Sequence, residues 1–154
     1  MTLNQQIQVL VQEASQYGVA PIVIESAIAP PLQVVAQQLN HLEFYIWQNM
    51  QQEWVVSVIK NRQSSGLEKK VIYGFATVQD AKQFPQHSSP DAIAIALPII
   101  QILFRLFSLQ QIDSIILFDT PGNTTQGTEI KRLDLQNLIQ QRLIQLKTIP
   151  PDMA

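Results

Sequence analysis

The first third of the chain shows apolar stripes of helical spacing separated by short breaks. Over residues 3–17 an apolar side chain recurs every three or four positions, which predicts a helix with one narrow apolar face and with Gly18 as its C-cap. Residues 19–28 are apolar and rich in β-branched side chains, so they predict a short strand, which Pro21 confines to a sheet edge or to irregular structure. A second, shorter helix is expected over residues 32–39.

Two aromatic segments in the middle of the chain have the pattern of a β-hairpin. Residues 42–48 and 53–60 are strand-like and are separated by a short polar turn. The register expected from this turn places Trp47 opposite Trp54 and on the same face as Tyr45, and such cross-strand pairs each stabilise a sheet by roughly 0.2–1 kcal/mol. Since the reverse face of the hairpin is apolar as well, either helices cover both faces or one face is a contact surface.

The aliphatic stretch 92–109 has two interpretations. It is either one long helix kinked at Pro98, or a strand over 92–97 followed by a helix that the proline opens. A proline inside a helix costs about 3 kcal/mol, whereas in the first turn it costs almost nothing, so the strand followed by a helix is favoured. The stretch is nearly as long as a membrane span, but the proline together with Gln101 and Arg105 favours a buried core segment.

The last third of the chain predicts a strand, a turn, a second strand and a helix. The apolar run 114–118 is followed by Asp-Thr-Pro-Gly, in which Gly122 supplies the positive φ of a Pro-Gly turn. A strand over 128–133 and an amphipathic helix opened by Asp134 come next. A further strand is expected over 71–76.

These elements predict one α+β domain over residues 1–147, in which helices pack on a mainly antiparallel sheet of about five or six strands. Residues 148–154 are expected to form a flexible tail. A chain of 154 residues with 46% hydrophobic and 14% charged side chains buries a core of its own, which excludes the disordered class.

Charge and residue types narrow the classes of function. The net charge is −2 with ten basic residues and no basic stripe, so no nucleic-acid partner is expected. The chain has no cysteine, and neither His41 nor His87 has a metal-ligand partner at helical or strand spacing, so neither a metal nor a cofactor is expected. The first residues lack the basic start and apolar run of a signal peptide, which favours a cytoplasmic location without a membrane partner.

Three residues near the C-terminus have the arrangement of a metal-dependent nuclease site. Asp119 ends one strand, and Glu129 and Lys131 alternate along the next, as in restriction-like nucleases that hold a divalent metal. Side chains at i and i+2 share a face of a strand, so both would face one metal-bound water. The simpler interpretation is a solvated hairpin strand, which the acidic net charge favours.

Tyr45, Trp47 and Trp54 are the candidate binding residues. Tryptophan and tyrosine are enriched at the centres of protein interfaces, because each combines a large rigid apolar body with a polar tip. If the first helix covers these three side chains they belong to the core; if it does not, they form an exposed patch that monomers rarely carry.

Two structural motifs in the second half of the chain carry a family resemblance. The strand over 71–76 runs into Phe-Ala-Thr, where Thr77 has the position of an N-cap and Asp80 that of the third helical residue. Later, the strand over 115–118 ends in the Asp-Thr-Pro-Gly turn. In these features residues 73–138 resemble the domain named for the SseB protein, which is linked in bacteria to type III secretion and serine sensitivity.

The resemblance covers less than half of the chain and departs from the family pattern at two positions. Thr120 is inserted in a turn that is of the Asn-Pro-Gly type in the family, and Ala76 differs in the capping stretch. The resemblance implies an α+β, non-enzymatic protein-interaction domain, and it names no partner.

The leading hypothesis is therefore a non-catalytic protein-interaction or adaptor domain. It would act through the aromatic sheet face or the helix over residues 3–17, on a protein partner or on a second copy in a homodimer. The alternative is the small metal-dependent nuclease that uses Asp119, Glu129 and Lys131.

Overall fold

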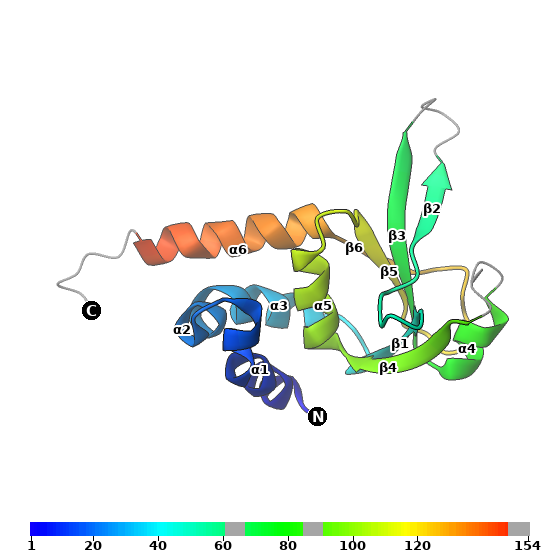
Figure 1. Cartoon of the computed structure of the whole chain (residues 1–154), viewed down its shortest axis with the longest axis horizontal. Helices are drawn as coiled ribbons and strands as arrows, with labels where there is room; N and C mark the ends of the chain where they lie inside the picture. Colours follow the sequence, from blue (N-terminus) through cyan, green and yellow to red (C-terminus); the bar gives the residue numbers. More distant parts are fainter. Residues whose placement is uncertain (61–66, 85–90, 148–154) are drawn as a thin grey trace.

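The computed structural model describes residues 1–60, 67–84 and 91–147, and in these ranges six strands form one sheet (Figure 1). The strands are β1 (Glu43–Gln48), β2 (Ser57–Lys60), β3 (Glu68–Phe75), β4 (Ile93–Pro98), β5 (Ser114–Phe118) and β6 (Thr128–Lys131). They lie in the order β4-β1-β3-β5-β6, and β2 pairs with the N-terminal half of β3. β3 and β5 are parallel, whereas the other pairs within these ranges are antiparallel. The predicted α+β fold with a mainly antiparallel sheet of five or six strands is confirmed.

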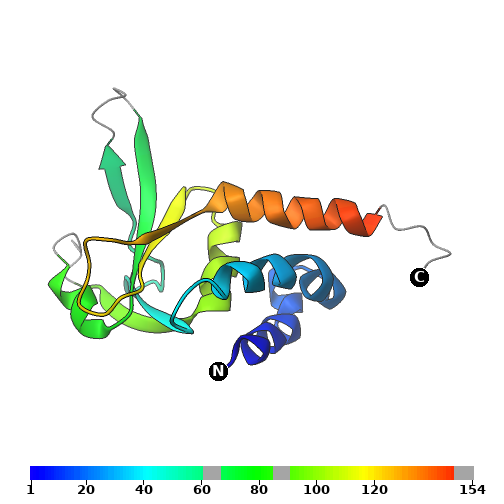
Figure 2. The same cartoon turned by 180° about the vertical axis from the view of Figure 1, so that it is seen from behind.

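Most helices lie on one face of the sheet, and one short helix lies on the other (Figure 2). The first group comprises α1 (Leu3–Gln12), the 3₁₀ helix η1 (Ala14–Tyr17), α2 (Pro21–Val23), the π-helix η2 (Ile24–Ile28), α3 (Ala29–Ala36), α5 (Ile99–Ser108) and α6 (Arg132–Lys147). The exception is α4 (Val78–Gln83), which packs against β1, β3 and β4 from the opposite side. We call these two sides of the sheet the helical face and the aromatic face.

The main core fills the space between the helical face and the helices. Phe44 and Ile46 of β1 and Ile115 and Leu117 of β5 are fully buried there. Gly74 of β3 lies between the two strands, and a Cβ at this position would come within 2.5 Å of Leu117 Cδ2. Glycine therefore lets the side chains of β1 and β5 meet across β3.

Residues 19–28 are helical, so the predicted edge strand is wrong. Pro21 stands in the first turn of α2, and the chain continues through η2 directly into α3. Ile24, Ala27 and Ile28 are buried in this segment, and their positions i, i+3 and i+4 lie on one side of a helix. Tertiary burial on a helical period has overridden the strand preference of the β-branched side chains.

Residues 92–109 form a strand and a helix, as the cost of an interior proline predicted. β4 ends at Pro98, which has an extended ψ of 142° and is the N-cap of α5. The amide of Ile100 in the first turn donates to the side chain of Gln6, whose own amide donates to the backbone of Leu42. This buried glutamine fixes α1 against the start of α5.

The predicted hairpin register is wrong by one residue. Gln48 forms an isolated β-bridge with Trp54 rather than with Glu53, after which the chain diverges and β2 pairs with β3. The tight turn causes the shift: Asn49 N–H donates to Glu53 C=O, and Gln52 has a positive φ of 63°. A slip of one residue sends side chains to the opposite face, so Trp47 and Trp54 lie on different sides of the sheet.

Other predicted boundaries agree closely with the structure. Thr77 caps α4, because its hydroxyl accepts from Asp80 N–H at 3.1 Å, and Gly18 ends η1 with a φ of 70°. α6 begins at Arg132 rather than at Asp134, directly after β6. In the described ranges no helix combines the length and apolarity that a membrane crossing needs. The predicted tail at 148–154 lies outside these ranges.

Candidate functional site

Six aromatic side chains gather on the aromatic face. They are Tyr45, Trp47, Tyr73, Phe75, Phe84 and Phe118. Phe75 is fully buried, with its ring centroid 5.2 Å from that of Phe84 and 5.5 Å from that of Phe118. Burial raises the pKa of the Tyr73 phenol, so this group stays neutral at physiological pH. The buried half of the cluster is a second, smaller core beneath α4.

Two of the predicted binding residues lie at the open end of this cluster. Tyr45 and Trp47 are half-buried and stand opposite Ala96 and Ala94 of β4. Trp47 Nε1 donates to the backbone carbonyl of Ala81 in α4, 3.2 Å away, which fixes the indole. Because the two alanines are small, the tyrosine and tryptophan rings remain partly accessible from the outer strand.

The outer edge of β4 carries backbone groups that point away from the sheet. Ile99 N–H donates to Leu42 C=O at 2.9 Å, which fixes the phase of the β1–β4 ladder. In an antiparallel pair every second residue bonds to the partner strand. Ile95 therefore bonds to β1, whereas the N–H and C=O groups of Ala94 and Ala96 face outward. Within the described residues, β1 is the only strand that pairs with β4.

Among the described residues, this edge also carries little of the usual protection against strand pairing. Natural edge strands are blunted by charged side chains, prolines or short length. β4 has six residues without a charge, Ile-Ala-Ile-Ala-Leu-Pro, and only Pro98 at its end interrupts the row of donors. The outer strand β6 has four residues that include Glu129 and Lys131, and β2 has four that include Lys60. β4 is thus the edge best suited to accept another strand.

A groove of about 710 Å³ lies on the helical face next to β4. Ile95 and Leu97 of β4 line it, and Gln101, Arg105 and Ser108 line it from one side of α5. Gln48 of β1, Tyr17, Phe104 and the turn residues 51–53 complete its lining. The groove is therefore apolar along β4 and rich in amide groups around it.

Trp54, the third predicted binding residue, is buried beside this groove. It is 6% exposed, and the Arg105 guanidinium lies 4.5 Å from the centroid of its ring. Arg105 also donates to the backbone carbonyl of Gln52 at 2.9 Å. Burial lowers the pKa of Arg105, and the carboxylate of Glu53 opposes this shift; the guanidinium stays cationic at neutral pH. Trp54 is therefore part of the main core, separated from Tyr45 and Trp47 by the sheet.

The three predicted nuclease residues are not brought together. Glu129 accepts from the hydroxyl of Ser114 at 2.7 Å and pairs with Lys69. Ser114 begins β5, whereas Asp119 follows its last residue, so the two carboxylates bind at opposite ends of that strand. Lys131 is exposed. No group of three metal-binding side chains is found in the part of the chain that the structure describes.

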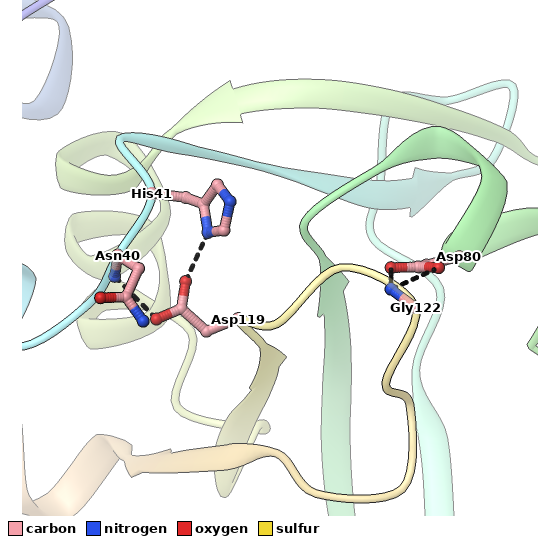
Figure 3. Close-up of polar contacts among 5 residues, drawn as sticks. All are labelled: Asn40, His41, Asp80, Asp119 and Gly122. Carbon is pink, nitrogen blue, oxygen red and sulfur yellow. Dashed lines mark hydrogen bonds and ion pairs between the residues drawn. The ribbon is translucent and has the colours of Figure 1, made fainter.

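Asp119 instead joins two segments distant in sequence (Figure 3). Its Oδ2 accepts from the backbone N–H of Asn40 at 2.7 Å. Its Oδ1 lies 2.7 Å from His41 Nδ1. Nearby, the buried carboxylate of Asp80 accepts from Gly122 N–H at 3.0 Å. Gly122 has a φ of 81°, which confirms the predicted turn. These carboxylates fix the loop after β5.

Replacing Asp119 with alanine is expected to lower the free energy of unfolding by about 1–3 kcal/mol, because the Asn40 amide and the His41 ring lose their acceptor. Urea denaturation followed by circular dichroism measures the change. The control His41→Ala should cost less, since it leaves the bond to Asn40 in place. Equal stability of Asp119→Ala and the unmodified protein would show that the carboxylate does not hold these segments.

The sequence interpretation missed the groove, although one signal was present. Gln101, Arg105 and Ser108 recur at intervals of four and three in an otherwise apolar segment, which is the pattern of one polar helix side. Gln48 shares a face with Phe44 and Ile46 by the alternation along β1, but the contribution of turn residues 51–53 was not predictable, because it depends on the conformation of the turn. Of the two histidines, His41 contacts Asp119, and His87 lies outside the described residues.

The sequence matches no known family model, and no curated protein is significantly similar to it. The resemblance of residues 73–138 to the SseB-type domain therefore stays a prediction.

Proposed function

We propose that this chain is a non-catalytic protein-interaction module that binds an extended segment of a partner polypeptide by strand addition along β4. The observation that carries the proposal is the uncharged outer edge of this strand, which pairs with no other strand in residues 1–60, 67–84 and 91–147. The resemblance to SseB-type domains implies the same class of function. The module would act in the cytoplasm, the location that the sequence favours.

Backbone pairing would supply the affinity. Ala94 and Ala96 each offer an outward N–H donor and C=O acceptor in the phase that an added strand requires. Each backbone hydrogen bond contributes about 0.5–1.5 kcal/mol. Such bonds do not depend on the side chains of the partner. The first requirement for binding would therefore be a partner segment that can adopt an extended, strand-like conformation.

The aromatic face would add contact area on one side of the added strand. Alternate side chains of a strand next to β4 would lie beside Ala94 and Ala96, within reach of Tyr45 and Trp47. Tryptophan and tyrosine dominate the energetics of many protein interfaces. Tyr45 and Trp47 therefore keep their predicted role as binding residues in this proposal, whereas Trp54 does not.

The N-terminal helix is less suited to docking. Its apolar residues Ile7 and Leu10 are buried in the main core, and Gln6 is fixed to Leu42 and Ile100. The apolar side of this helix is thus packed against the main core of the same chain and does not face solvent. The proposal assigns recognition to the sheet edge.

Selection from a library of random linear peptides displayed on phage tests the proposal. The expected result is a set of extended peptides that bind the unmodified protein and bind Ala96→Pro at least about tenfold more weakly, since proline removes an outward donor without breaking the bonds to β1. The control Ala96→Ser keeps the donor and should bind normally. Selection of no peptides, or equal binding to Ala96→Pro and Ala96→Ser, would contradict strand addition.

A second copy of the chain is the competing occupant of this edge. Size-exclusion chromatography coupled to light scattering should give a monomer at the concentrations used for peptide binding. A dimer that Ala96→Pro converts into a folded monomer would assign the edge to self-association, and would contradict its proposed use for a separate partner.

A further inference from the structure

Two polar groups beside the groove have no hydrogen-bond partner among the residues that the structure describes. Gln48 is 5% exposed and lines the groove, yet its side chain forms no hydrogen bond with another residue of the described ranges. Trp54 stands opposite it in the β-bridge, and its buried Nε1 has no partner in these ranges either. Buried polar groups in proteins are almost always hydrogen-bonded. The Gln48 amide is open to the groove rather than enclosed, so a ligand in the groove could form hydrogen bonds with it.

The charges around the groove favour an uncharged ligand group. Arg105 and Glu53 are the charged residues of its lining, and they carry opposite charges. Arg105 is already engaged by Trp54 and the backbone of Gln52. A ligand carboxylate would be repelled by Glu53, and a ligand ammonium group would be repelled by Arg105. A neutral amide meets no such repulsion and can pair with the donors and acceptors of the lining.

The path from an added strand into the groove runs over β4. Ile95 and Leu97 line the groove, and together with Ile93 they are the β4 residues on the helical face. Alternate side chains of a strand paired with β4 lie on that same face. A side chain placed there needs an apolar stem to pack on Ile95 and Leu97, and a terminal group long enough to reach Gln48.

We infer that the groove recognises a glutamine side chain of the bound segment, with its amide paired to that of Gln48. The inference rests on the proposed strand addition and gives it sequence specificity. Glutamine combines a stem of two methylene groups with a neutral head that both donates and accepts hydrogen bonds, as does the Gln48 amide. The partner class is thus an extended, uncharged segment with glutamine on the side that faces the groove.

Peptides selected on the unmodified protein test this inference by substitution. Changing the groove-facing glutamine of a selected peptide to methionine keeps the length of the side chain and should weaken binding about tenfold. In the variant Gln48→Leu the two peptides should bind equally, because the protein amide is gone. Fluorescence anisotropy of labelled peptides gives both dissociation constants.

A second variant keeps the test decisive if Gln48→Leu does not fold. Gln101 is exposed and lines the groove, so Gln101→Glu should fold normally and should shift the selected residue from glutamine to lysine. Selected peptides without groove-facing glutamine, or an unchanged preference in both variants, would overturn the inference. Peptides that depend on the Ala96 donor but lack glutamine would overturn only this step, whereas insensitivity to Ala96→Pro would overturn strand addition itself.

Discussion

Replacing Trp54 with alanine will lower the free energy of unfolding by about 3–5 kcal/mol, the range typical of a large buried aromatic side chain. Trp54 is 6% exposed, packs in the main core and supports the guanidinium of Arg105. The same change at the half-buried Trp47 will cost less than about 2 kcal/mol. Urea denaturation followed by circular dichroism separates the two variants.

The control is Trp54→Phe, which keeps an aromatic ring and removes an Nε1–H that has no partner among the described residues. It should retain most of the stability that Trp54→Ala loses. Equal losses for Trp47→Ala and Trp54→Ala would contradict the difference in burial between Trp54 in the main core and Trp47 on the aromatic face.

Replacing Phe75 with alanine will also cost about 3–5 kcal/mol, because its fully buried ring joins β3 to Phe84 and Phe118. The loss should be accompanied by faster amide hydrogen exchange in α4, the helix that covers this cluster. Urea denaturation and hydrogen exchange followed by NMR measure the two effects.

Tyr45→Ala is the matched control for this second core. Tyr45 lies on the same face but is half-buried, so its removal should leave α4 protected and cost clearly less. If Phe75→Ala were no more destabilising than Tyr45→Ala, the aromatic face would not contain an organised core, and the fixed position of Trp47 would lose its explanation.

The sequence predicted correctly those helix and strand boundaries that depend on residues close together in the chain. The proline argument separated β4 from α5 correctly, because the cost of proline in a helix is set within one turn. The Thr77 cap was likewise predictable from Thr77 and Asp80 alone. Both depend on backbone hydrogen bonds between near neighbours.

Elements that depend on distant contacts were less predictable. The apolar segment 19–28 suits either a strand or a buried helix, and only its packing in the main core decides between them. The turn after β1 changes the register by one residue, which moves Trp54 to the helical face.

The candidate site was predictable only in part for the same reason. Tyr45 and Trp47 were identified as residue types common in interfaces, and they lie together at an open part of the sheet. The position of β4 at the edge of the sheet that the structure describes depends on strand order, which no local pattern contains. The alternation of Glu129 and Lys131 was correct as a strand pattern, but Asp119 is used elsewhere in the fold.

Amide hydrogen exchange in β4 tests the central claim most directly. In the free protein the outward N–H groups of Ala94 and Ala96 should exchange rapidly, and that of Ile95, which bonds to β1, slowly. Saturation with a selected peptide should slow Ala94 and Ala96 and leave Ile95 unchanged. Rapid exchange of both alanine amides in the peptide complex would show that the bound segment does not pair with β4, and would contradict strand addition.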